Sequence, residues 1–330
     1  MRFVVIGLGS MGKRRVRNLL RLGHAEITGY DPREDRRAEA AEKYDIATTG
    51  DLDAALAGPA DAWIVSTPPD THAAYGIRAA DRGIAFFAEA GVADPQIDTL
   101  IDRIEKTGVV GAASCTMRYY DGPRMIKSLI ADGSIGRPLS FVYQSGQYLP
   151  DWHPWESYKD FYVSNPATGA CREIVPFELA WLTDIFGAVT SLAGMRAKLS
   201  ELDADIDDIY QLLLRFAGGA LGHMTVDVLA RPAVREFRLL GSEGTIEWNH
   251  TANRIRVWRA QTGAWEDISL DPGSVEAGYI HAEEPYVAEM ADFVAAVEGT
   301  KPWPYSFEQD EKILALLVDA ERDSDARDPK

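Results

Sequence analysis

The first twelve residues place an apolar run directly before a glycine pattern, and this order constrains the fold more than any other feature. Residues 3–6 predict a buried strand, Gly7-x-Gly9-x-x-Gly12 follows, and a helix is expected from Met11 to Leu22. In such a unit the first glycine permits a tight turn, and the second lets the backbone approach a pyrophosphate. The third lets the helix pack closely on the strand. The pattern therefore predicts a dinucleotide-binding βα unit, and an ordinary glycine-rich turn is the alternative.

The start of this helix offers free N–H groups and the positive end of the helix dipole, which favour phosphate. We therefore expect Ser10 and Met11 to contact the cofactor together with the three glycines. A second strand, Glu26 to Tyr30, ends in Asp31. That acid follows the glycines by about 20 residues, the spacing at which a carboxylate accepts from the adenosine ribose.

Asp31 also predicts NAD rather than NADP, because a carboxylate would repel the 2′-phosphate of NADP. Arginines and a lysine nearby keep NADP open as the alternative, since they could bind that phosphate. We expect them instead to be the solvated faces of two helices. They are Arg33, Arg36 and Arg37, with Lys13, Arg14 and Arg15 in the first helix.

Strands alternate with helices as far as Ser114, which predicts an α/β, doubly wound parallel sheet. Beyond Gly122 the pattern changes to a run of strands, with Gly218-Gly219 as a hairpin turn. The fold class is therefore an N-terminal Rossmann dinucleotide-binding domain, residues 1–120, plus a C-terminal α+β domain with an open, mainly antiparallel sheet, residues 121–330. The C-terminal helices are expected to pack back on the first domain or to stay with the second, and residues 323–330 are expected to be disordered.

The net charge of −17 argues against nucleic acid and anionic lipid as partners. The two cysteines, Cys115 and Cys171, suggest neither a disulfide framework nor a metal centre, and they fit a reducing compartment. No signal-peptide pattern or apolar run long enough to span a membrane is present. We therefore expect a cytoplasmic protein with no metal.

Four segments together resemble the Gfo/Idh/MocA oxidoreductases. They are Gly7-Leu8-Gly9-Ser10-Met11-Gly12, Ser66-Thr67-Pro68-Pro69-Asp70-Thr71-His72, Gly133-Ser134-Ile135-Gly136 and Gly241-Ser242-Glu243-Gly244-Thr245-Ile246. The resemblance implies hydride transfer between NAD or NADP and a hydroxyl of a sugar, inositol or related polyol. It also implies a homodimer or homotetramer formed through the open sheet. It places further residues at the cofactor, namely Ser66, Thr67, Pro68, His72 and Glu89.

The chain departs from the family where chemistry is expected, which suggests an atypical subgroup. The family's Glu-Lys-Pro is here Glu89-Ala90-Gly91, so its lysine is missing. The family's aspartate and histidine, four residues apart on a helix, align with Glu173 and Phe177. The segment from Trp152 to Tyr162 forms a motif of its own, which we associate loosely with cell-surface sugar biosynthesis.

A base must then come from other residues, and the active site is expected between Glu89 and the face formed by residues 152–162 and Glu173. The candidates for proton transfer are His153 first, then Tyr158 or Lys159, with Glu173 orienting the base or the substrate. The alternatives are a structural histidine, a surface lysine, and an ion pair of Glu173 with Arg172 or Arg118.

Aromatic and basic residues near this motif are candidates for substrate contacts. Trp152 and Trp155 could stack on a sugar ring, or they could form the core of a long loop. Arg172, Arg231 and Arg235 could clamp a carboxylate or phosphate, and ordinary pairing with acids is the alternative.

Two functions follow from these expectations. The first is an NAD(P)-dependent oxidoreductase that acts on a hydroxyl of a sugar or sugar-derived substrate, with or without an acidic group or a linked nucleotide. The second is a non-catalytic homologue that keeps the cofactor fold for binding or regulation.

Overall fold

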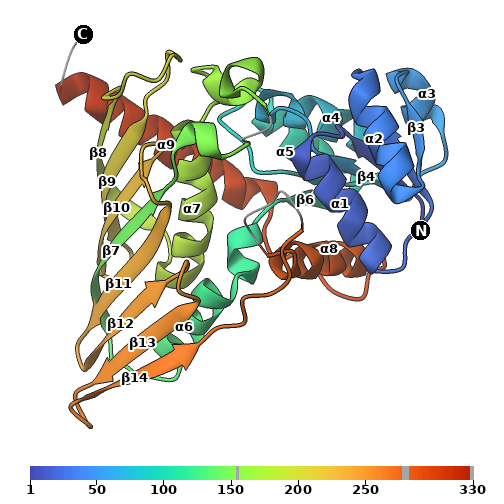
Figure 1. The fold of residues 1–330 in the computed structure, drawn as a ribbon. Coiled ribbons are helices and arrows are strands. Elements are labelled where there is room, and N and C mark those ends of the chain that lie inside the picture. The colour runs from blue at the N-terminus through green and yellow to red at the C-terminus, as the bar shows by residue number, and fades with distance from the viewer. Residues whose placement is uncertain (154–155, 277–281, 328–330) are drawn as a thin grey trace. The chain divides into compact units, whose positions relative to one another are not determined.

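The computed structural model describes residues 1–153, 156–276 and 282–327 (Figure 1). Its chain divides into two compact units. The first unit contains residues 1–116 and 273–312, and the second contains residues 117–272 and 313–330. The first unit thus includes residues 273–312, which follow most of the second unit in sequence. We expected residues 121–330 to form the second domain, with C-terminal helices that could pack back on the first. None of the described helices is long and apolar enough to cross a membrane.

The first unit is built on a six-stranded parallel sheet in the order β3-β2-β1-β4-β5-β6. The strands are β1 (Phe3–Ile6), β2 (Ile27–Tyr30), β3 (Ala47–Thr49), β4 (Ala62–Val65), β5 (Ala85–Ala88) and β6 (Gly111–Ala113). Every residue of β1, β4 and β5 is buried, as expected for a parallel sheet covered on both faces. This confirms the expected doubly wound fold.

The helices of this unit are α1 (Ser10–Arg21), α2 (Glu34–Tyr44), α3 (Leu52–Ala57), α4 (His72–Ala80), α5 (Ile97–Thr107) and α8 (Glu284–Val297). Helix α8 comes from the late segment and joins the core of the early one. Its Met290 and Phe293 are buried in the same apolar cluster as Val5 and Phe87. Sequence patterns had predicted α1, α2, α4 and α5, but not β3 or α3, which are short.

The register of the sheet sets the neighbouring strand ends side by side. Ile6 pairs with Tyr30 and with Val65, while Val65 pairs with Ala88, and Ala88 with Ala113. The residues just beyond these ends therefore share one edge of the sheet. They are Gly7, Asp31, Ser66, Glu89 and Ser114. In a doubly wound sheet this carboxyl edge is where ligands bind.

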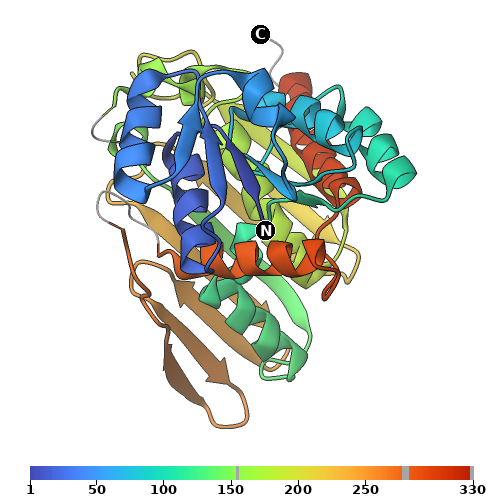
Figure 2. The ribbon, with the colours of Figure 1, turned by 90° about the vertical axis from the view of Figure 1, so that its right-hand side faces the viewer.

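The second unit contains an eight-stranded sheet in the order β14-β13-β12-β11-β7-β10-β9-β8, in which only the β7–β10 pair is parallel. The orange strands β11 to β14 lie next to one another in both views (Figures 1 and 2). The strands are β7 (Pro138–Gly146), β8 (Val189–Ala197), β9 (Ile209–Phe216), β10 (Leu221–Asp227), β11 (Val234–Gly241), β12 (Gly244–Asn249), β13 (Arg254–Arg259) and β14 (Ala264–Ser269). The open, mainly antiparallel sheet and the Gly218-Gly219 hairpin are thus confirmed.

Two helices, α6 (Asp121–Ala131) and α7 (Cys171–Phe186), belong to this unit. Short 3-10 turns lie at residues 69–71, 116–119, 149–151, 158–160 and 162–164. Trp181 of α7 packs edge-on against Tyr143 of β7 and Phe237 of β11. One face of the sheet is therefore covered by α7, and alternate strand residues point to the opposite face.

The expected disorder of residues 323–330 is wrong as far as the structure describes them. Helix α9 runs from Phe307 to Arg327, and residues 313–327 of it belong to the second unit. Its Asp323 accepts a hydrogen bond from the backbone N–H of Gly194, and its Ser324 accepts one from that of Arg196. Strand β8 is an edge strand, so these side chains satisfy N–H groups that have no neighbouring strand.

Candidate functional site

The turn between β1 and α1 needs glycine at two of its three glycine positions. Gly7 has a φ of +93°, and a Cβ there would lie 2.5 Å from the carbonyl oxygen of Ser66. A Cβ on Gly12 would lie 1.8 Å from the carbonyl oxygen of Gly7. A Cβ on Gly9 would instead meet only the Arg36 guanidinium, at 3.4 Å. The strand, turn and helix therefore pack as a dinucleotide site requires, with the backbone at Gly9 left open to approach.

Asp31 lies beside this turn and is held in place by backbone groups. Its carboxylate is almost fully buried and accepts hydrogen bonds from the N–H groups of Leu8, at 2.8 Å, and Arg33, at 2.9 Å. The Arg36 guanidinium lies 3.8 Å from the same carboxylate. The glycine turn and this fixed acid fit a dinucleotide cofactor whose adenosine ribose donates to Asp31.

The loop after β4 carries the next group of expected cofactor residues. The Thr67 and Thr71 hydroxyls are 2.6 Å apart, and Thr71 donates to the carbonyl of Pro68. His72 is buried, and its Nε2 lies 2.9 Å from the carbonyl oxygen of Thr67. Because a carbonyl only accepts, Nε2 carries the proton. Burial lowers the pKa of His72, so a neutral His72 holds the shape of this loop.

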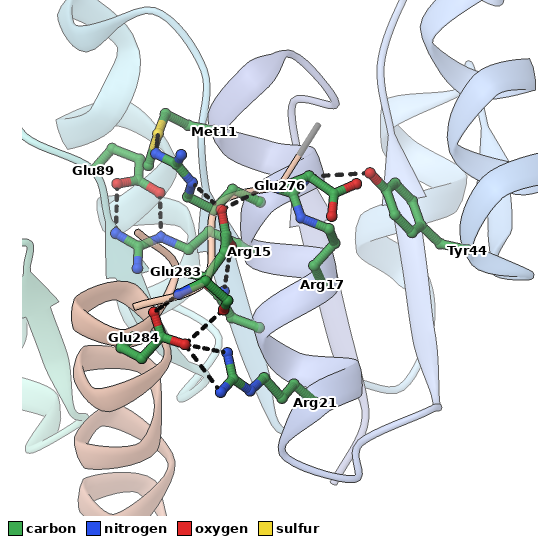
Figure 3. Close-up of polar contacts among 12 residues, drawn as sticks. Met11, Arg15, Arg17, Arg21, Tyr44, Glu89, Glu276, Glu283 and Glu284 are labelled. Atoms are coloured by element: carbon green, nitrogen blue, oxygen red, sulfur yellow. Dashed lines mark hydrogen bonds and ion pairs between the residues drawn. The ribbon is translucent and has the colours of Figure 1, made fainter. Parts of the chain in front are cut away.

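Two arginines of α1 correct the expectation that this helix face is solvated. Arg14 and Arg15 are both buried. Arg14 donates to Glu283 at 3.0 Å. Arg15 donates to both carboxylate oxygens of Glu89, at 2.6 and 2.8 Å (Figure 3). They are therefore internal ion-pair partners and are not available to the 2′-phosphate of NADP.

In the second unit, one group of motif residues is linked by ring contacts and hydrogen bonds. The His153 ring stacks on Phe161 with centroids 5.0 Å apart, and Phe161 meets Tyr162 edge-on. The Tyr162 hydroxyl donates to the Glu173 carboxylate, with oxygen distances of 2.9 and 3.1 Å. The structure thus connects two of the predicted proton-transfer residues, His153 and Glu173, through Phe161 and Tyr162.

The other two predicted residues contact a different segment. Lys159 forms an ion pair with Asp203, and the backbone N–H of Asp203 donates to the Tyr158 hydroxyl. Lys159 and Asp203 are both exposed, which is the arrangement of a surface pair. Trp152 donates its indole N–H to the carbonyl of Gln147, and Trp155 lies outside the described residues.

The three arginines proposed for substrate binding have separate partners within the second unit. Arg172 pairs with Glu321 at 2.8 Å, and the Arg231 guanidinium lies 3.4 Å from the centroid of the Tyr148 ring. Arg235 has only 12% of its side chain exposed and donates to the fully buried Glu178 at 2.9 Å. Arg118, the other residue considered as a partner of Glu173, lies 3.5 Å from Asp184. Two of the three substrate arginines are thus paired with acids.

Sequence patterns missed the polar centre of this unit, Glu178. Its fully buried carboxylate accepts from the Tyr143 hydroxyl at 2.6 Å and from Arg235. It also accepts from the Ser145 hydroxyl and the Trp181 indole. An acid one residue after the apolar Phe177 was the only available signal, because its four partners are scattered along the chain.

His250 lies beside this centre and predicts a pH dependence of stability. Burial and the nearby Arg235 charge lower the pKa of His250 from 6.5 to about 4. As the pH falls from about 6.5 to about 4, the unfolded chain gains a proton that the folded protein does not. The free energy of unfolding should therefore fall across this window by up to about 3 kcal/mol. Urea unfolding of the wild type and His250→Gln measures this, and an equal loss in both proteins would contradict it.

Comparison with known proteins agrees with this geometry. Residues 1–113 match the model of the oxidoreductase family with an NAD-binding Rossmann fold, and residues 123–247 match the Gfo/Idh/MocA C-terminal domain. Levoglucosan dehydrogenase of Pseudarthrobacter phenanthrenivorans is 26% identical over 64% of this chain and 62% of that protein, so the match spans less than two thirds of its length. Myo-inositol 2-dehydrogenase of Thermotoga maritima is 25% identical over 96% of this chain and 94% of that protein.

Among solved structures, an oxidoreductase from Agrobacterium radiobacter in complex with NAD⁺, L-tartaric acid and magnesium has a TM-score of 0.86 at 16% identity. That match covers 100% of this chain and 97% of the other. At this identity the likeness concerns the fold. The two family models together match most of the residues of each unit, and the description of the first agrees with the glycine turn. The chain therefore belongs to the Gfo/Idh/MocA family of oxidoreductases, and its residues 1–113 are that family's NAD-binding Rossmann fold.

Proposed function

We propose that the protein is an NAD-dependent oxidoreductase that acts on a hydroxyl of a sugar or sugar-derived substrate. The observation that carries the proposal is the intact dinucleotide turn, with Gly7 and Gly12 in packing that excludes any other residue and Asp31 held beside it. The names of two relatives, a levoglucosan and a myo-inositol dehydrogenase, support a polyhydroxylated ring as substrate.

NAD, when bound, would supply the hydride acceptor. The residues of the chain bind the cofactor, orient the substrate and move the hydroxyl proton. Asp31 accepts from the adenosine ribose, and the first N–H groups of α1 face the phosphates. His153 removes the hydroxyl proton, and Glu173, held by Tyr162, orients His153 or the substrate. Trp152 stacks on the ring of the substrate. Arg231, which is exposed, remains the arginine best suited to an acidic substituent.

A screen of substrates tests this function directly. Sugars, inositols, uronates and sugar nucleotides are mixed with the protein and NAD, and NADH is followed by its absorbance. We expect turnover with at least one polyhydroxylated substrate. If the protein binds NAD and turns over none of them, the non-catalytic function is favoured instead. The missing lysine at Ala90 and the missing histidine at Phe177 are the observations that favour this second function.

The preference for NAD over NADP is a prediction of its own. We expect NAD to bind at least about tenfold more tightly, since about 1.4 kcal/mol of repulsion at Asp31 has that effect. Asp31→Asn keeps the acceptor for Leu8 but removes the negative charge beside Arg36, so that the Arg36 guanidinium can attract a 2′-phosphate. NADP should therefore bind more tightly to Asp31→Asn than to the wild type, and more weakly again when Arg36→Ala is added. Calorimetric dissociation constants measure this, and tighter NADP in the wild type would contradict it.

We also propose that two copies associate through the uncovered face of the eight-stranded sheet. Val142 and Leu213 flank His223 in the same row across three strands, and they are 55% and 60% exposed. Leu221 and Leu240 flank Ser140 in the next row and are also exposed. A contiguous apolar patch of this kind favours association. Light scattering should find a dimer or tetramer, and Val142→Glu with Leu213→Glu should yield monomers. A monomeric wild type would contradict this.

A further inference from the structure

A second polar cluster lies at the carboxyl edge of the parallel sheet, on the side away from Asp31. Ser66, Glu89 and Ser114 follow strands β4, β5 and β6. Beneath them, Arg15 of α1 donates to Glu89 and also to Glu289 of α8, at 2.8 Å. No residue of this cluster other than Ser66 and Glu89 was expected to bear on the cofactor.

The Arg15 guanidinium is held through its Nε and Nη2 atoms, which donate to Glu89 and Glu289. The side chain is 0% exposed, and its Cζ lies 4.5 Å from the centroid of the Phe87 ring. Glu289 is itself fixed, because it accepts from the Cys115 N–H at 2.7 Å and the Thr116 hydroxyl at 2.6 Å, besides Ser114 and Arg15. A bidentate contact from so rigid a donor fixes the plane of the Glu89 carboxylate.

Glu89 keeps one acceptor position open. Its Oε1 accepts from Arg15 Nε and from the Ser66 hydroxyl, at 2.6 and 3.2 Å. Its Oε2 accepts only from Arg15 Nη2 among the described residues, although a carboxylate oxygen has two lone pairs. The Glu89 side chain is 11% exposed, so the free lone pair can reach a ligand.

The position of Glu89 in the sheet indicates which part of a bound dinucleotide it would contact. A dinucleotide lies across the point where the strand order reverses, here between β1 and β4. Asp31 follows β2 and receives the adenosine ribose, so the nicotinamide half lies over β4 and β5. The hydrogen-bond donor that a nicotinamide ring carries is its carboxamide NH₂, and a carboxylate oxygen can only accept.

We propose that Arg15 is a positioning residue that holds Glu89 so that its Oε2 accepts a hydrogen bond from the nicotinamide carboxamide. The proposal rests on NAD binding by the first unit and deepens it. It does not depend on which substrate is oxidised. Glu289 takes part by accepting from Arg15 Nη2, the same nitrogen that donates to Glu89 Oε2, and α8 thereby contributes to the cofactor site from the late segment of the chain.

An NAD analogue in which an acetyl group replaces the carboxamide tests the proposal, because the acetyl group has no N–H to donate. Dissociation constants are measured by calorimetry for NAD, for this acetylpyridine analogue and for ADP-ribose, which lacks the nicotinamide. The wild type should bind NAD about tenfold or more tightly than the analogue, the effect of a hydrogen bond to a charged group. In Glu89→Gln and Arg15→Lys, the ratio of the analogue's dissociation constant to that of NAD should fall to less than about threefold. The dissociation constant of ADP-ribose should be unchanged in both variants.

Arg14→Lys is the matched control, because Arg14 is buried on the same helix and pairs with Glu283 instead. Its ratio should equal that of the wild type. A ratio near one in the wild type overturns the proposal. A ratio in Glu89→Gln equal to that of the wild type also overturns it, and this variant decides the question if Arg15→Lys does not fold. Equal weakening of all three ligands in Arg15→Lys also overturns it, since Arg15 would then only support the fold. None of these measurements needs turnover, so failure here is distinct from failure of the proposed activity.

Discussion

Replacing His153 by alanine is expected to lower kcat by about 10²–10⁴-fold, the usual contribution of a general base, and to leave the dissociation constant of NAD unchanged. His153 stacks on Phe161, which adjoins the Tyr162–Glu173 pair, so the histidine has an ordered ring and a carboxylate in the same group. Steady-state kinetics on the best substrate of the screen, with calorimetry of NAD binding, measures both quantities.

Tyr158→Phe and Lys159→Ala are the controls for this prediction, because both residues contact Asp203 rather than Glu173. They should keep kcat within about threefold of the wild type, whereas Glu173→Gln should lose activity together with His153→Ala. If His153→Ala and Glu173→Gln both keep more than about a third of the wild-type kcat, the base is elsewhere. A large loss in Lys159→Ala would point to the amine as the replacement for the family's lysine.

Arg235→Met is expected to cost about 3–5 kcal/mol of folding free energy, because it leaves the Glu178 carboxylate buried without its charge partner. Glu178 would keep its neutral donors, among them Tyr143 and Trp181, but these do not neutralise its charge. The sequence had suggested Arg235 as a clamp for an anionic substrate. The buried pair predicts a loss of stability first, and urea unfolding followed by circular dichroism measures it.

A double variant separates the charge from the packing. Adding Glu178→Gln to Arg235→Met removes the uncompensated charge and should recover part of the stability. Arg231→Met is the matched surface control, since Arg231 is exposed on the Tyr148 ring, and it should change stability by less than about 0.5–1 kcal/mol. A cost below about 1 kcal/mol for Arg235→Met would show that the Arg235–Glu178 pair is not structural, and the substrate role would then regain support.

Local patterns predicted most of the fold, because the residues that set them are neighbours in sequence. An apolar run before Gly7 forms a buried strand and a tight turn wherever it occurs, and Gly12 must pack on Gly7 within the same unit. The run of strands beyond Gly122 and the Gly218-Gly219 turn likewise depend on nearby residues only. Strands β8 and β14 escaped prediction because both are edge strands. Edge strands lack the continuous apolar signal of central ones.

The candidate site was predicted in part, for the same reason. Gly7 and Asp31 were predicted as cofactor residues from their places after strands, and Glu89 was predicted from the family resemblance, but the sequence did not indicate what holds Glu89. The linkage of His153 to Glu173 also needed the structure, since the ring contacts of Phe161 and Tyr162 have no spacing that identifies them.

The sequence by itself determined the dinucleotide turn, the parallel sheet and the place of the acid proposed to select NAD, because each depends on residues close together along the chain. Only the tertiary structure decided the roles of the arginines in α1. Arg15 is separated from Glu89 by 74 residues and from Glu289 by 274. A basic helix face is typical of solvated surfaces, and it becomes a buried ion-pair centre only where distant segments bring carboxylates to it. Burial and charge pairing are properties of the packed chain, so they had to be read from the structure.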